Sequence, residues 1–119
     1  MVRRQFKICR LSDLPAGRSR GFTVAVPGGS GDIFLVRKGA RVFGYQNSCP
    51  HTGGPLDWVP DQFLNLEGSL IQCATHDALF RIEDGLCLKG PCAGRPLNAL
   101  LVEVNEGRVS VILDVSGHE

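Results

Sequence analysis

The chain has 119 residues, which is enough for one compact domain and leaves no room for a second. Thirteen Lys and Arg against twelve Asp and Glu give a formal charge of +1, so charge favours neither nucleic acid nor an anionic membrane as a partner. No apolar run approaches the roughly 20 residues that span a bilayer, and no signal-like apolar segment follows the basic N-terminal residues. We therefore expect a cytoplasmic domain.

Glycine and proline occur 15 and 7 times, which favours short strands joined by turns over long helices. In chain order, the sequence predicts strands at residues 6–10, 22–26, 32–37, 41–46, 100–104 and 108–113. Turns are expected at residues 11–17, 27–31, 38–40 and 105–107. This spacing, without a helical period, predicts an all-β sandwich or barrel.

Five cysteines, an odd number without an export signal, favour metal ligation over a disulfide framework. Four of them, and two of the three histidines, fall in the loop-rich residues 47–99. Two motifs stand out there, Cys49-Pro50-His51 and Cys73-Ala74-Thr75-His76. Each offers one thiolate and one imidazole on a tight turn, so the pair supplies two sulfur and two nitrogen ligands.

Two metal groups accept this ligand set. Tetrahedral zinc does, although zinc fingers usually pair Cys with Cys and His with His. The other is a [2Fe–2S] cluster in which two histidines replace two cysteines on one iron. The ligand types alone leave both groups open.

The sequence resembles Rieske-type ferredoxin domains over nearly its whole length. The resemblance is carried by Cys49-Pro50-His51-Thr52-Gly53-Gly54-Pro55-Leu56, Cys73-Ala74-Thr75-His76-Asp77-Ala78-Leu79-Phe80, Gly85, Gly90-Pro91 and residues 97–104. It implies a Rieske-like antiparallel β-sandwich of three sheets, formed by one domain at residues 1–119. A small cluster-binding subdomain is expected at about residues 47–92.

The resemblance also implies a ligand set and a function. Cys49 and Cys73 are expected to bind one iron of a single [2Fe–2S] cluster, and His51 and His76 the other, with Pro91 in a third loop that covers the cluster. The charges of two ferric ions, two sulfides and two thiolates cancel, so the oxidised site accepts an electron readily. The expected role is a one-electron carrier between a reductase and an oxygenase or another acceptor, not an enzyme by itself.

Two departures refine this expectation. Ala78 and Phe80 stand where the respiratory-complex branch has hydroxyl donors, and the cluster loops lack that branch's additional cysteines, so we expect the ferredoxin branch and a low Rieske potential. The segment at residues 57–68, which contains Trp58 and Phe63, is longer than in most such ferredoxins. It either packs on itself or forms a lid or docking surface.

The sequence also allows functions other than an electron carrier. A small subunit or regulatory module of a larger oxidoreductase, similar to the nitrite reductase small subunit, and a zinc-binding structural module remain as alternatives. An oxygenase needs an iron held by two histidines and one carboxylate, and His118 alone is left for this. The three remaining cysteines, expected to be small, buried and reduced, are Cys9, Cys87 and Cys92.

Overall fold

The structure, a computed structural model, describes residues 2–26, 29–48, 56, 62–65, 67–73, 78–90 and 93–115. These residues form a 3-10 helix, η1 (Leu11–Asp13), and the strands β1 (Val2–Arg10), β2 (Ser19–Val26), β3 (Gly29–Lys38), β4 (Arg41–Gln46), β5 (Leu70–Cys73), β6 (Ala78–Arg81), β7 (Cys87–Lys89), β8 (Ala99–Asn105) and β9 (Arg108–Val115). The predicted all-β fold is confirmed. In the part of the chain that is described, no helix is long and apolar enough to cross a membrane.

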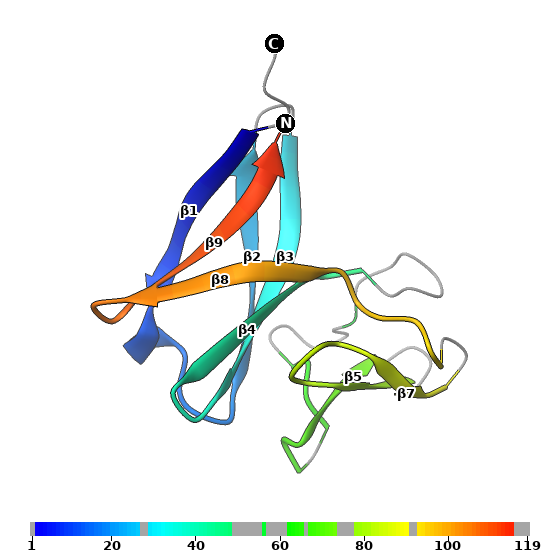
Figure 1. Ribbon diagram of the computed structural model, residues 1–119. Coiled ribbons are helices and arrows are strands. Elements are labelled where there is room, and N and C mark those ends of the chain that lie inside the picture. The colour runs from blue at the N-terminus through cyan, green and yellow to red at the C-terminus, as the bar shows by residue number, and fades with distance from the viewer. Residues whose placement is uncertain are drawn as a thin grey trace.

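The strands form two antiparallel sheets (Figure 1). The larger, which we call the scaffold sheet, has the order β1-β9-β8-β4-β3-β2, and the small sheet has the order β5-β6-β7. Residues 99–100 of β8 pair with β4, whereas residues 101–105 pair with β9. β8 therefore joins two halves of the scaffold sheet. With the halves counted separately, they and the small sheet are the three sheets that were expected.

The strand β3 is covered on both faces. Its residues Ile33, Phe34, Leu35 and Val36 are at most 3% exposed. Successive side chains of a strand point to opposite faces. Ile33 and Leu35 therefore enter the core of the scaffold sheet, which we call the scaffold core, and Phe34 and Val36 enter a second core. Burial on both faces explains why residues 33–36 of this strand are a continuous apolar run without polar alternation.

The second core, which we call the interface core, joins the scaffold sheet to the small sheet. It contains Phe34, Val36, Tyr45, Leu56, Phe63, Ile71, Cys73, Ala78, Phe80, Ile82, Cys87 and Leu97. The small sheet was not expected as strands, since residues 47–99 look loop-rich. Its strands have only three or four residues each, too few for a clear alternating pattern, and packing on the scaffold sheet holds them in place.

The β8–β9 hairpin has the tight turn that the sequence predicts. Asn105 pairs with Arg108, which leaves Glu106 and Gly107 as the two turn residues. Both have positive φ, 52° and 75°, as a type I′ turn requires. The glycine adopts this conformation at little cost, whereas Glu106 does so against the preference of an L-residue.

The β2–β3 hairpin differs from its prediction in one respect. Val26 pairs with Gly29, so β3 already begins inside the glycine-rich stretch that was expected to be a turn at residues 27–31. Residues 27–28, which connect the strands, lie outside the described residues. Two-residue connections match the twist of paired strands, and this favours continued pairing over a longer loop.

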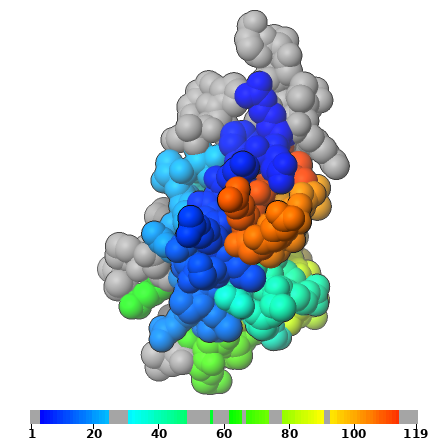
Figure 2. Space-filling view, turned by 90° about the vertical axis from the view of Figure 1, so that its left-hand side faces the viewer, coloured from blue at the N-terminus to red at the C-terminus, as the bar shows by residue number. Residues whose placement is uncertain are grey.

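The segment after β1 packs across the scaffold sheet. Figure 2 shows β1 and the following residues on the surface beside the β8–β9 hairpin. The Leu11 amide donates a hydrogen bond to the Gly107 carbonyl at 2.7 Å, and the side chain of Leu14 is fully buried. The Arg37 guanidinium donates to the carbonyls of Leu11 and Leu14 at 3.2 and 3.1 Å. The turn expected at residues 11–17 therefore begins with the 3-10 helix η1 and is fixed to both halves of the scaffold sheet.

Candidate functional site

One of the four predicted ligand residues lies among the described residues. Cys73 is the last residue of β5 and is fully buried in the interface core. Cys49, His51 and His76 lie outside the described residues. Among the described residues alone, accordingly, no three Cys, His, Asp or Glu side chains form a group that could hold a metal ion.

The second motif lies at the connection between β5 and β6. Cys73 pairs with Ala78, and residues 74–77, including His76, connect these two positions. Ile71 and Cys73 on β5 and Ala78 and Phe80 on β6 are all fully buried. Because alternate residues of a strand share one face, this pattern directs one face of the hairpin into the interface core.

The first motif lies in a segment whose two ends are tied together. The Leu56 amide donates a hydrogen bond to Asn47 Oδ1 at 2.8 Å, and the Asn47 amide donates to the Asp32 carbonyl on β3 at 2.9 Å. Leu56 is fully buried in the same core as Cys73. The segment that carries Cys49 and His51 thus starts at a position fixed to β3 and ends at a residue of the interface core, which also contains Cys73.

A third segment begins beside the second motif. Gly90 follows β7 and has a φ of +112°, and a Cβ there would lie 2.9 Å from the Ala78 Cα. Only glycine allows both this conformation and this close approach. The residues of the expected covering loop, Pro91 and Cys92, lie outside the described residues.

Two of the cysteines not assigned as ligands are described. Cys87 is 2% exposed, and its Sγ lies 3.3 Å from the Lys89 carbonyl. Cys9 is a half-buried free thiol that packs on the scaffold core. Burial, followed by the nearby Asp13, raises the pKa of this thiol, which keeps it protonated. Cys87 is buried, as expected, whereas Cys9 is only half-buried.

The longer segment at residues 57–68 is described in part. Phe63 is fully buried and stacks on Phe34 with 4.3 Å between ring centroids. Its amide donates to Ser19 Oγ at 3.2 Å, and Leu64 pairs with Ile71. This part of the segment therefore packs into the interface core, against β3 and β5. Trp58 lies outside the described residues.

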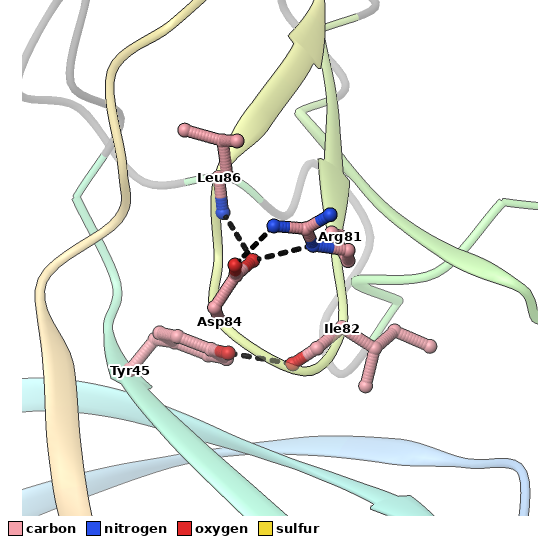
Figure 3. A network of polar contacts seen from close by, with 5 residues as sticks. All are labelled: Tyr45, Arg81, Ile82, Asp84 and Leu86. Carbon is pink, nitrogen blue, oxygen red and sulfur yellow. Dashed lines mark hydrogen bonds and ion pairs between the residues drawn. The ribbon is translucent and has the colours of Figure 1, made fainter.

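Sequence reasoning missed the turn between β6 and β7, residues 82–86, which contacts the scaffold sheet (Figure 3). Asp84 accepts hydrogen bonds from Arg81 Nε at 2.9 Å and from the Leu86 amide at 3.0 Å. These contacts, that from Arg81 first, lower the pKa of Asp84 to about 2. The Asp84-Gly85 pair is a turn signal from which this turn could have been predicted. Its contacts to the distant β4 leave no signal in the sequence.

A family model for the Rieske [2Fe–2S] domain matches residues 4–112. The chain belongs to the Rieske [2Fe–2S] domain family. Its cofactor is accordingly one [2Fe–2S] cluster. The donor types of this Rieske chain fit that group, because two Cys-and-His motifs supply two thiolates and two imidazoles, and the segments that carry both motifs are anchored in one core.

Individual Rieske proteins are similar to most of this chain. Ferredoxin CarAc of Metapseudomonas resinovorans is 29% identical over 105 residues, which are 88% of this chain and 90% of that protein. The ferredoxin of carbazole 1,9a-dioxygenase from Nocardioides aromaticivorans IC177 is 26% identical with a TM-score of 0.71, over 90% of this chain and 95% of that one. A structure of reduced oxygenase with oxidised ferredoxin of carbazole 1,9a-dioxygenase matches with 28% identity and a TM-score of 0.70, over 90% and 91% of the two chains.

Proposed function

We propose that this protein is the ferredoxin component of an oxygenase system and carries single electrons from a reductase to the oxygenase. One observation carries the proposal: the chain and the carbazole dioxygenase ferredoxins match over nine-tenths of both lengths. The partners that follow are a reductase and an oxygenase or another redox acceptor.

We propose Cys49, His51, Cys73 and His76 as the ligands of the [2Fe–2S] cluster. When bound, the cluster accepts one electron and returns it. The thiolates of Cys49 and Cys73 supply negative charge to one iron, and the neutral imidazoles of His51 and His76 supply nitrogen to the other. The buried position of Cys73 supports this assignment, because an apolar core around a thiolate excludes water from the metal.

We further propose one domain, residues 1–119, with its cluster-binding subdomain at about residues 47–92, and a cytoplasmic location. The scaffold core and the interface core share the strand β3, which supports a single folding unit.

The proposal is tested by reconstituting electron transfer. The purified protein is reduced by a ferredoxin reductase with NADH or NADPH and then mixed with an oxidised Rieske oxygenase, and the absorption of both proteins is followed by stopped flow. A carrier becomes reduced, is reoxidised by the oxygenase and turns over many times. A zinc module takes up no electron, and a subunit of a larger oxidoreductase is reduced only within its own complex, so either result contradicts the carrier function.

A further inference from the structure

Two residues of the scaffold sheet hold consecutive residues of the β6–β7 turn. Tyr45, on β4, donates a hydrogen bond from its hydroxyl to the Ile82 carbonyl at 2.5 Å (Figure 3). Lys38, the last residue of β3, forms an ion pair with Glu83. The turn is therefore tied to two neighbouring scaffold strands, and Tyr45 makes the buried one of these contacts.

The fit between Tyr45 and the turn is close. Gly85 has a φ of +74°, and a Cβ there would lie 2.7 Å from Cε1 of Tyr45. Tyr45 and Ile82 are each 2% exposed. Without the hydroxyl, the Ile82 carbonyl would lose its partner in a place shielded from water, which makes this single hydrogen bond important for the turn.

This contact is mechanically connected to the second cluster motif. Ile82 directly follows β6, and the first residue of β6 is Ala78, which pairs with Cys73. At about 3.3 Å per residue, the held carbonyl lies roughly 13 Å along the strand from Ala78. Ile82, Ala78 and Cys73 share one close-packed core, which transmits a displacement instead of absorbing it.

We propose that Tyr45 is a positioning residue for the cluster site: by holding the Ile82 carbonyl, it fixes β6 along its own axis and thereby places Cys73 and Ala78, the two ends of the second ligand loop, relative to the scaffold sheet. The inference rests on the proposed ligand role of Cys73 and His76. The ion pair of Lys38 and Glu83 contributes less, because these side chains are 57% and 41% exposed.

The test uses the cluster-loaded protein and the variant Tyr45→Phe, which keeps the ring and removes one donor. Amide hydrogen exchange in β5–β7 is expected to become about tenfold faster, while exchange in β1 and β9 stays unchanged. The reduced-state EPR lines are expected to broaden, because the ligand loop then adopts a range of positions. Iron release to a chelator is expected to accelerate by a similar factor.

Two further variants test whether this result is specific to the contact between Tyr45 and Ile82. Thr23→Val also removes one side-chain hydrogen bond, that from Thr23 Oγ1 to Asp32 Oδ1 at 2.8 Å between β2 and β3, and must leave the small sheet and the EPR lines unchanged. Gly85→Ala disturbs the same contact from the turn side and is expected to reproduce the selective loosening of the small sheet.

The proposal is overturned if the amide hydrogens in β5–β7 of Tyr45→Phe exchange at the wild-type rate. It is also overturned if exchange becomes faster by the same factor in both sheets. Selective acceleration with an EPR spectrum identical to that of the wild type also overturns it, because Tyr45 would then stabilise the sheet without positioning the ligands. A wild-type protein without any cluster signal contradicts the proposed function instead, and the exchange data then report on the contact independently.

Discussion

The proposed ligands differ from the other cysteines in a way that substitution detects. Replacing His51 or His76 by Ala removes a nitrogen ligand, so we expect the Rieske EPR signal to disappear and bound iron to fall. Cys9→Ser is the control, because Cys9 packs on the scaffold core with its thiol pKa raised by burial, away from the proposed ligand loops. The measurement is EPR together with iron analysis; a full signal in His76→Ala would contradict the ligand assignment.

Ala78 and Phe80 set the expected potential. Both are fully buried and lie on the face of the β5–β6 hairpin that also carries Cys73. Neither side chain has a hydrogen-bond donor. A hydroxyl there stabilises the more negative reduced state, so Ala78→Ser and Phe80→Tyr are expected to raise the reduction potential measured by voltammetry. Leu79→Thr, on the other face of β6, is the control. An unchanged potential with an intact cluster would show that these positions do not face the cluster.

Tyr45 gives the stability of the protein an alkaline limit. Burial first, and then Asp84 and Glu83, raise its pKa to about 12, compared with about 10 in an unfolded chain. The stabilisation is therefore complete below pH 10 and is lost as the pH rises through about 12. Tyr45 is the single tyrosine, so the rise of phenolate absorbance with pH reports it directly.

The free energy of unfolding measured in urea is expected to decrease between pH 10 and 12 in the wild type. In Tyr45→Phe it is expected to be lower by about 1–2 kcal/mol at neutral pH, because the Ile82 carbonyl loses its partner. The same variant lacks the titrating group, so this decrease is expected to be smaller. An ordinary phenol titration near pH 10 would contradict the buried contact.

The β8–β9 hairpin depends on Gly107 in its turn. Gly107→Ala places a side chain at a φ of 75° with nothing within 4 Å, so the backbone alone is affected, and we expect a loss of about 1 kcal/mol. Gly31→Ala is the matched control, because Gly31 also has open space but no positive φ. Chemical denaturation checks both, and an equal loss in the two variants would contradict the turn argument.

Local patterns predicted the larger elements well. The strands of the scaffold sheet follow from β-branched runs and glycine turns, which act within a few residues, and Gly107 marked the last hairpin. β1 begins at Val2, four residues before the expected strand, because pairing with β9 extends it through the charged residues at its start. Pairing with a neighbour, unlike alternation, leaves no local signal.

The candidate site was predicted as residues but not as an arrangement. Motif spacing singled out Cys73, and the structure locates it at the end of β5, a strand with one buried face. The bond from Leu56 to Asn47 and that from Tyr45 to Ile82 join residues 9 and 37 positions apart. Such contacts depend on how the small sheet packs on the scaffold, and a single sequence carries no record of that packing.

The fold combines the scaffold sheet with a small sheet that carries the second Cys-and-His motif. The radius of gyration is 13.9 Å, close to the approximately 13.5 Å expected for one compact domain of this length. This agreement supports the single-domain proposal. The scaffold, through β3 and β4, provides one wall of the interface core, so the stability of the whole chain and the placement of the site are coupled.

We propose that this chain holds one [2Fe–2S] cluster with two cysteine and two histidine ligands. Pulsed EPR of the anaerobically purified, reduced protein tests it most directly, because the hyperfine couplings count the nitrogen ligands. We expect two irons and two acid-labile sulfides per chain, and couplings from two histidine nitrogens that change on labelling with ¹⁵N-histidine. Zinc without acid-labile sulfide, or a cluster without nitrogen coupling, would contradict the claim.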